Sequence, residues 1–172
     1  MCLACAILTG RYMTEDERLA LPYRPNVGLM VLNRAGHVFV AQRLDYPSAA
    51  WQMPQGGIDA DEDPQTAALR ELLEETGIAE DSIEILAQSA QWLHYDFPAD
   101  LAAKLMKGRY RGQKQRWFLL RFTGADHQIN IETEEPEFSA WRWMPPDALI
   151  DNIVAFKRDV YKKVIAEFQD YL

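Results

Sequence analysis

Residues 56–78 constrain the fold of this chain more than any other stretch, because they combine helix-ending signals with a fixed pattern of charges. The segment reads GGIDADEDPQTAALRELLEETGI. Asp63 followed by Pro64 predicts the start of a helix, since aspartate caps a helix N-terminus and proline is favoured in the first turn. Gly77 supplies the glycine that often follows a last turn. The sequence therefore predicts a helix between Asp63 and Gly77, with a loop on each side.

The predicted helix carries three acidic side chains on one face. Glu71, Glu74 and Glu75 are related as i, i+3 and i+4, so they point in similar directions. The roughly opposite face carries the positions expected to enter the core: Leu69, Leu72, Leu73 and Thr76. Taken alone, E-x-x-E-E usually marks a solvated acidic face. Three carboxylates on one face also provide the hard oxygen ligands that Mg²⁺ prefers.

The full pattern decides between these two interpretations. It is G-x5-E-x7-R-E-L-x-E-E-x-G-I, and its chance occurrence in a chain of this length is on the order of 10⁻⁷. It resembles the Nudix box at every defining position, which here are Gly56, Glu62, Arg70, Glu71, Leu72, Glu74, Glu75, Gly77 and Ile78. The resemblance implies a loop–helix–loop that holds magnesium, in a hydrolase that cleaves a diphosphate linked to another moiety.

The composition of the chain limits the number of domains and the classes of function that it can have. A hydrophobic content of 48% and 19 aromatic residues (7 Phe, 7 Tyr and 5 Trp) are enough to build one core in 172 residues. The net charge of −8 argues against an indiscriminate nucleic-acid binder, whose footprint would be basic. A phosphate substrate is still compatible with this charge, because metal ions at an acidic site invert the local charge.

The N-terminal residues give no sign of a membrane segment. Residues 1–12, MCLACAILTGRY, are too short to span a membrane and lack the basic region of a signal peptide. Cys2 and Cys5 have no second pair to complete a zinc site, so two free thiols in a reducing cytoplasm are expected. We expect residues 1–20 to be an extension, with a functional start at Met13, and residues 21–172 to form the domain.

The remaining patterns predict a mixed sheet between helices. An apolar run, a turn and an alternating run predict a hairpin over residues 27–43. Further strands are expected at 51–54, at 82–97 as one long or bent strand, at 113–122 and at 138–144, with a short helix at 98–107. A final helical region follows Pro146, with an apolar stripe of Ile153, Phe156, Val160, Val164 and Phe168. We expect an α/β Nudix fold in which the sheet is sandwiched between helices.

Four further stretches make the resemblance more specific. YRPNVG, WQMPQGG, QKQRWFLL, and PEFSAWRW followed by FKRDVY are similar to bacterial RNA pyrophosphohydrolases and to the related dinucleoside polyphosphate hydrolases. The resemblance implies conversion of 5′-triphosphorylated RNA to monophosphorylated RNA and pyrophosphate, which promotes mRNA decay. Diadenosine tetra- or pentaphosphate is the alternative substrate, and a non-catalytic nucleotide-binding module is the alternative class. Ala50 stands where enterobacterial RNA pyrophosphohydrolases carry a serine.

The resemblance also assigns roles to single residues. The catalytic candidates are Glu71, as lead general base or metal ligand, together with Arg70 and Glu137. The candidate metal ligands are Glu71, Glu74, Glu75, Glu137 and Gly56. Glu62 is expected to be a structural or outer partner of the site. The expected cofactor is Mg²⁺, for which Mn²⁺ or another divalent cation can substitute.

The substrate side is expected to be basic. Residues 101–125 contain seven basic residues and no acidic one, which is informative in an acidic chain. The substrate-binding candidates are Arg24, Arg43, Gln55, Gln113, Lys114, Phe156 and Lys157. Phe156 can equally be a core residue, and Lys157 is expected to be an exposed phosphate contact. No DNA, membrane or obligate protein partner is expected.

Overall fold

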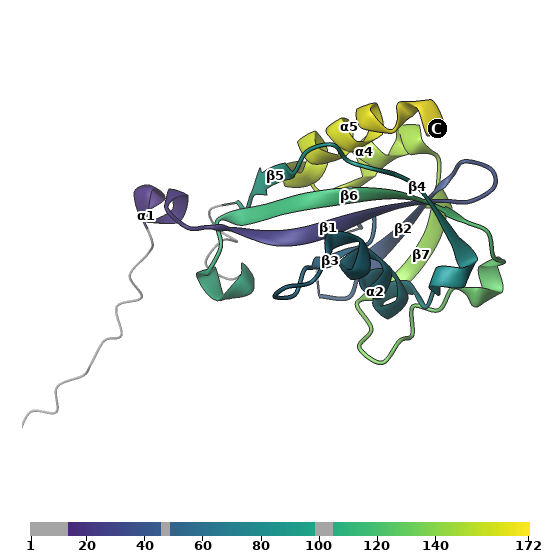
Figure 1. The fold of residues 1–172 in the computed structure, drawn as a ribbon. Helices are drawn as coiled ribbons and strands as arrows, with labels where there is room; N and C mark the ends of the chain where they lie inside the picture. The colour runs from purple at the N-terminus through teal and green to yellow at the C-terminus, as the bar shows by residue number, and fades with distance from the viewer. Residues whose placement is uncertain (1–13, 46–48, 99–104) are drawn as a thin grey trace, which may run out of the picture.

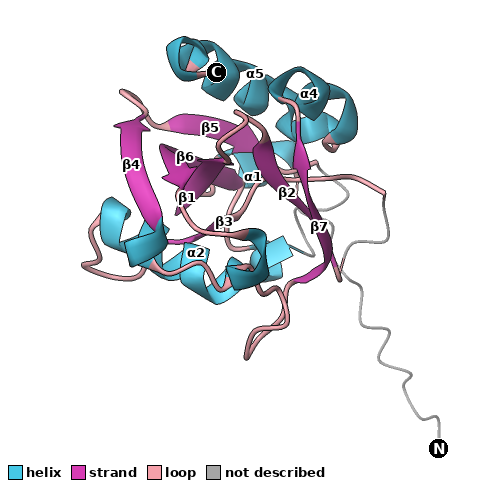
Figure 2. Ribbon diagram, turned by 90° about the vertical axis from the view of Figure 1, so that its right-hand side faces the viewer, coloured by secondary structure: helices cyan, strands magenta, loops and turns pink. Residues whose placement is uncertain are grey.

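The computed structural model describes residues 14–45, 49–98 and 105–172, and these residues build a mixed sheet with helices on both faces (Figures 1 and 2). The seven strands run in the order β4-β6-β1-β2-β7, with β3 paired to β1 and β5 paired to β6. Their bounds are β1 Tyr23–Leu32, β2 Val38–Arg43, β3 Gln55–Gly57, β4 Ile83–Gln88, β5 Leu93–Asp96, β6 Gly112–Phe122 and β7 Phe138–Met144.

The sheet is mixed because one pair of its strands is parallel. The two long central strands, β1 and β6, run parallel over ten matched positions, from the Tyr23–Gly112 pair to the Leu32–Arg121 pair. The other pairs are antiparallel, including the β1–β2 hairpin. The predicted mixed α/β sheet and the predicted hairpin over residues 27–43 are therefore confirmed.

The helices cover the two faces of the sheet separately. Helix α2 (Pro64–Thr76) lies on one face, and α4 (Leu149–Asn152) and α5 (Arg158–Glu167) lie on the other (Figure 1). A short helix, α1 (Glu15–Leu19), precedes β1. The 3₁₀ turns are Glu80–Ser82, Leu105–Gly108, Asp126–Gln128, Pro146–Ala148, Ala155–Lys157 and Gln169–Tyr171. No helix in the described parts of the chain is long and apolar enough to cross a membrane.

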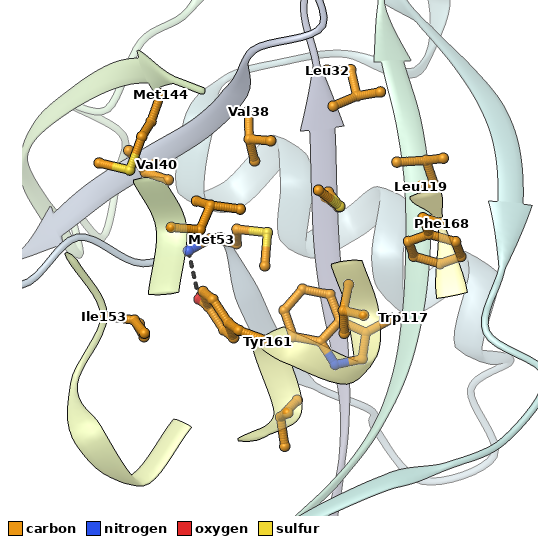
Figure 3. Close-up of a cluster of buried hydrophobic side chains, with 14 of the residues drawn as sticks. Leu32, Val38, Val40, Met53, Trp117, Leu119, Met144, Ile153, Tyr161 and Phe168 are labelled. Carbon is orange, nitrogen blue, oxygen red and sulfur yellow. Dashed lines mark hydrogen bonds between the residues drawn. The ribbon is translucent and has the colours of Figure 1, made fainter. Parts of the chain in front are cut away.

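Each face of the sheet has its own core. On the α5 face, Trp117 and Tyr161 pack edge to face, and the Met53 backbone amide donates to the Tyr161 hydroxyl at 2.8 Å (Figure 3). Gly28 lies directly under the Trp117 indole, where a Cβ would overlap the ring. The predicted stripe also holds on this face, since Ile153, Val160, Val164 and Phe168 are buried, whereas Phe156 is only half-buried.

The ends of α2 form as the sequence predicts, but its buried face differs. The Asp63 carboxylate accepts from the amides of the second and third helical residues, and Gly77 adopts a positive φ of 69°. Of the four predicted core positions, Leu72 and Thr76 are buried, Leu69 is half-buried and Leu73 is 51% exposed. The helix instead buries Ala67, Ala68 and Glu75. Small alanines allow α2 to lie close to β1 and β3, which turns the Leu73 side outward.

Two predicted strands are corrected. The segment 82–97 is two strands, because the chain leaves the β6 ladder at Ser89, whose hydroxyl accepts the Trp117 amide in place of a backbone carbonyl. The strand expected at 51–54 is reduced to one β-bridge between Gln52 and Ala41 of β2, and strand β3 follows at Gln55–Gly57. Pro54 lies between them and has no amide hydrogen to donate to a ladder. The helix predicted at 98–107 falls largely on residues 99–104, which are outside the described residues.

Candidate active site

The predicted box residues meet where α2 packs against β3. Gly56 lies opposite Val27 in the sheet, and a Cβ at Gly56 would overlap the Glu71 carboxylate. Only a glycine therefore lets the β3 backbone approach Glu71 this closely. The structure brings Gly56 and the acidic side of α2 together, as the spacing of the box suggests.

Arg70 joins the loop, the strand and the helix of the box. Its guanidinium donates to both carboxylate oxygens of Glu62 at 2.8 Å and to the Gly57 carbonyl at 2.8 Å. It also reaches Glu71 at 2.9 Å and Glu74 at 3.2 Å. The Arg70 bonds lower the pKa of Glu62 to about 2, so this carboxylate is ionised at neutral pH. Arg70 and Glu62 thus hold the loop between β3 and α2 in place.

Glu75 is the most unusual carboxylate of the site. It is 2% exposed, its Oε2 accepts the Gln55 amide at 3.0 Å, and its Oε1 has no hydrogen-bond partner. Burial raises the pKa of Glu75 well above its usual value, and the charges of Glu137 and Glu71 raise it further. Burial also raises the pKa of Glu71, against the opposing effect of Arg70. The carboxyl groups of Glu75, Glu71 and Glu137 therefore lie close enough to repel one another.

This donor set fits a hard divalent cation. A buried carboxylate oxygen without a partner, next to two further carboxylates, is stabilised by a positive ion, and carboxylate oxygen is what such an ion binds. In the described residues, however, no three acidic, histidine or cysteine side chains already converge as a complete ligand group. Glu71 and Glu74 are turned to Arg70, and Glu137 is turned to Arg43. Binding a cation would require these side chains to change partner.

Glu137 comes to the site from the edge of the sheet formed by β7. It directly precedes β7 and accepts from Arg43 Nη1 at 2.8 Å, at the end of β2. The same guanidinium binds Asp45 at 2.7 and 2.9 Å. These contacts raise the pKa of Arg43, with the Asp45 bond as the largest cause. Arg43 is therefore placed beside the carboxylates, with two acidic partners of its own.

A cluster of buried amides continues the site on the α5 face. Gln55 Nε2 donates to Gln113 Oε1 at 3.3 Å, and the Tyr95 hydroxyl donates to the same oxygen at 2.7 Å. Gln115 Nε2 donates to Asn26 Oδ1 at 2.7 Å. Two amide nitrogens of the cluster are buried without partners: Asn26 Nδ2 and Gln52 Nε2. Sequence reasoning singled out Gln55 and Gln113 but missed Asn26, Gln52, Tyr95 and Gln115; the polar residues alternating along QKQRW were the available signal.

Lys157 belongs to this buried cluster, so its expected exposure is wrong. It is 7% exposed, and its ammonium donates to Gln55 Oε1 at 2.9 Å and to Gln52 Oε1 at 3.1 Å. Burial, together with the positive charge of Arg43, lowers the pKa of Lys157 to about 7. The preceding residue, Phe156, is half-buried, with its ring 5.9 Å from the Tyr95 ring. Both side chains therefore face the amide cluster.

The last two substrate-binding candidates lie on opposite faces of the sheet. Arg24 lies across Gly57, where an added Cβ would meet its guanidinium, and it pairs in register with Gln113. Lys114, the next residue along β6, points to the α2 face, where its ammonium lies 5.3 Å from the Trp92 ring centroid. Arg24 and Gln113 thus share a face with Gln55, and Lys114 does not.

Comparison with known proteins gives consistent matches over nearly the whole chain. The NUDIX domain model matches residues 22–164. An RNA pyrophosphohydrolase of Roseobacter denitrificans is 59% identical over 160 residues, which cover 93% of this chain and 100% of that protein. One of Dinoroseobacter shibae is 54% identical with the same coverage.

Solved structures with the same fold are more distant in sequence. A C. elegans Ap4A hydrolase in a binary complex superposes with a TM-score of 0.64 at 22% identity, over 87% of this chain and 99% of that one. The E. coli dihydroneopterin triphosphate pyrophosphohydrolase superposes with a TM-score of 0.67 at 19% identity, over 84% and 98%. These likenesses concern the fold alone.

Proposed function

The chain belongs to the NUDIX domain family, and from this membership we propose that it is a metal-dependent RNA pyrophosphohydrolase that converts 5′-triphosphorylated RNA to 5′-monophosphorylated RNA. Relatives with this name, at 59% and 54% identity, match along their full length. The observation in the structure that carries the hydrolase proposal is the buried, unpartnered oxygen of Glu75 between Glu71 and Glu137. Such a site is unfavourable unless a cation binds there.

Mg²⁺ is the proposed cation, held by Glu74, Glu75 and Glu137 with the Gly56 carbonyl as a further oxygen ligand. Glu71 would be either a fourth carboxylate ligand or the general base. When bound, the cation would supply charge neutralisation at the phosphates and a lower pKa for a bound water. Mg²⁺ suits the site because it takes oxygen ligands and shares its coordination with substrate phosphates. The carboxylates match Mg²⁺ in their chemistry and are not arranged around a cation here. Arg70 binds Glu71 and Glu74, and Arg43 binds Glu137.

The chain's own residues would act where the box and the amide cluster meet at Gln55, which contacts both Glu75 and Lys157. Arg24, Gln113 and Lys157 would bind the polyphosphate from the side of the amide cluster, while Glu71 of the box would accept the proton of the attacking water. The new bond forms between water oxygen and phosphorus. The anhydride bond between the α- and β-phosphates breaks, and its electron pair leaves with pyrophosphate.

The alternative substrate is a dinucleoside polyphosphate. It presents a similar polyphosphate to the same groups, and Ala50 provides no hydroxyl for a contact to RNA. The proposal places the enzyme in the cytoplasm, where transcripts with 5′-triphosphates arise. It assigns residues 21–172 to the catalytic domain and residues 1–20 to an extension.

Pyrophosphate release tests the proposal directly. The purified chain with Mg²⁺ should release pyrophosphate from 5′-triphosphorylated RNA, and a chelator should abolish the release. The value of kcat/KM should be higher for this RNA than for diadenosine tetraphosphate measured side by side. A higher value for the dinucleotide would favour the alternative substrate. If the chain binds both substrates but shows no chelator-sensitive turnover, it is a nucleotide-binding module without catalytic activity.

A further inference from the structure

A second surface, formed by Trp92, His94, Lys114 and Arg116, lies on the α2 face of the sheet beside the box. The Lys114 ammonium and the Arg116 guanidinium each lie 5.3 Å from the centroid of the Trp92 ring. His94, opposite Lys114 in the β5–β6 ladder, is exposed and packs edge to face on Tyr23, with ring centroids 4.8 Å apart. We call these four residues the Trp92 surface.

The positive charges of this surface lack acidic partners. In the described portion of the chain, no salt bridge joins Lys114 or Arg116 to a carboxylate. Arg116 Nη1 donates to the Ser89 and Ala90 carbonyls at 2.8 and 3.0 Å, and its Nε is buried without a partner. Two unneutralised cations on one aromatic ring are unexpected in a protein of net charge −8. They favour an anionic ligand with planar groups.

Strand register places the surface close to the box and on the same face. Arg116 pairs with Val27, and Val27 pairs with Gly56. Neighbouring strands are about 4.8 Å apart, so the Arg116 backbone is roughly 10 Å from that of Gly56. Val27 belongs to the α2-side core, and Gly56 faces Glu71 from α2. A chain held by its 5′ end at the box can therefore reach the Trp92 surface within a few nucleotides.

We propose that the Trp92 surface binds the single-stranded body of the RNA, downstream of the nucleotides that enter the active site. A base stacks on the Trp92 ring, and the adjacent phosphates lie near Lys114 and Arg116. Aromatic platforms flanked by cations bind single strands without sequence preference, because every base has a stacking face. This inference rests on the proposed function for the identity of the bound strand, but the binding itself does not require turnover.

Binding is tested with an RNA that cannot use the active site. The probe is a labelled single-stranded RNA of about 12 nucleotides with a 5′-hydroxyl. Single-strand binding sites cover about 4–16 nucleotides, so this probe is longer than the smallest of them. Trp92→Ala should weaken binding at least about fivefold, the low end for one stacked base, whereas Trp92→Phe should retain most of it. Affinity falls with salt, and Lys114→Gln should make the plot of log affinity against log salt less steep by about 0.7. This is the value for the loss of one phosphate contact to a single strand.

The control variant is Lys163→Ala, which removes an exposed lysine on α5 and should change neither affinity nor slope. Melting temperatures of all variants check folding. If Trp92→Ala does not fold, the comparison of Trp92→Phe and Lys114→Gln with the wild type still decides the outcome. Unchanged affinity in folded variants overturns the proposal. A concentration-dependent dimer that is lost in the variants would assign the surface to a second copy and also overturn it.

Turnover separates this inference from the proposed function. Trp92→Ala should lower kcat/KM about fivefold or more on a triphosphorylated 12-mer and leave it unchanged on a triphosphorylated dinucleotide, which is too short to reach the ring. Equal losses on both would place Trp92 in the active site and overturn the inference. Wild-type protein that releases no pyrophosphate, yet binds the 5′-hydroxyl RNA through Trp92, would overturn only the proposed function.

Discussion

Two buried ionisable side chains meet at one glutamine of the site. The backbone amide of Gln55 donates to Glu75, and its side-chain oxygen accepts from Lys157. Each of these buried groups lowers the stability of the fold, because burial disfavours its charged form. The proposed function gives each of them a ligand of opposite charge: a cation for Glu75 and a phosphate for Lys157. The stability of the unliganded protein should therefore report on both.

Glu75→Gln should stabilise the unliganded protein while removing activity. The amide keeps the shape and can still accept the Gln55 amide, but it ends the repulsion from Glu71 and Glu137. We expect the free energy of unfolding at pH 7, in chelator, to rise by about 1.4 kcal/mol for each unit by which the pKa is raised. Activity should fall at least ~10²-fold.

The pH dependence of the wild type gives the sign of this effect. A raised folded-state pKa of Glu75 means that the folded protein binds more protons than the unfolded chain. The stability of the wild type should therefore fall, relative to that of the variant, as pH rises from about 4.5 to 7.

Glu74→Gln is the matched control, because Glu74 is 58% exposed and bound to Arg70. It should lose at least ~10²-fold in activity with little change in urea unfolding. Near-normal turnover of Glu74→Gln in saturating Mg²⁺ would remove the box from the catalytic site.

Lys157→Met should remove a rise of stability with pH. In the wild type the folded-state pKa is about 7, below the ordinary lysine value of 10.5, so the unfolded chain binds the extra proton between these two values. Stability should therefore increase by about 2 kcal/mol between pH 7 and pH 9. The difference between wild type and variant isolates Lys157 from other groups that titrate in this range. A difference that does not change with pH would show that Lys157 is solvated.

At the scale of elements, the sequence predicted what local signals determine. The caps of α2, the glutamates of the box, the hairpin and β6 each have a short-range cause, such as Asp63 before Pro64 or alternation along QKQRWFLL. Which side of α2 is buried depends on how closely β3 approaches, and that follows from Gly56 lying under Glu71 in the folded chain. The amide cluster likewise needs β1, β3 and β6 in register, which spacing along the chain does not reveal. Helix α1 did have a local signal, the T-x-x-E capping box at Thr14 and Glu17.

Arg70→Lys should loosen the loop–helix–loop while keeping its charge. One ammonium cannot replace a planar guanidinium that binds Glu62 through two atoms and also reaches the Gly57 carbonyl. We expect the free energy of unfolding to fall by about 1–3 kcal/mol, measured by urea titration. Arg158→Lys, at an exposed position of α5, is the control and should change nothing. Equal stability of the two variants would show that Arg70 does not hold the loop.

At the scale of the whole molecule, the sheet separates two kinds of chemistry that β3 brings together. The α2 face supplies carboxylates, and the α5 face supplies amides and Lys157. The long β1–β6 pair extends beyond this site to the end of the sheet where α1 lies (Figure 1). There, Asp96 of β5 accepts from Tyr23 at 2.8 Å and from Arg111 at 2.9 and 3.0 Å. The N-terminal attachment therefore lies directly beside the Arg24–Gln113 pair, one residue further along β1 and β6.

Truncation should show how much of the N-terminus the domain needs. A chain that starts at Met13 should fold and act like the full chain, because the box and the sheet lie beyond it; residues 1–12 themselves are outside the described residues. A chain that starts at Leu21 also loses the Arg111 bond to the Leu19 carbonyl, at 3.1 Å, and the 3.9 Å contact between Arg18 and Asp96. Exposed contacts of this kind contribute little, so we expect a loss of about 1 kcal/mol or less in unfolding free energy, with unchanged kcat/KM on a triphosphorylated dinucleotide. Circular dichroism melts and pyrophosphate release, measured on all three chains, check both expectations. A Met13 chain that is insoluble, or melts far below the full chain, would make residues 1–12 part of the folded structure and move the domain boundary upstream of residue 21.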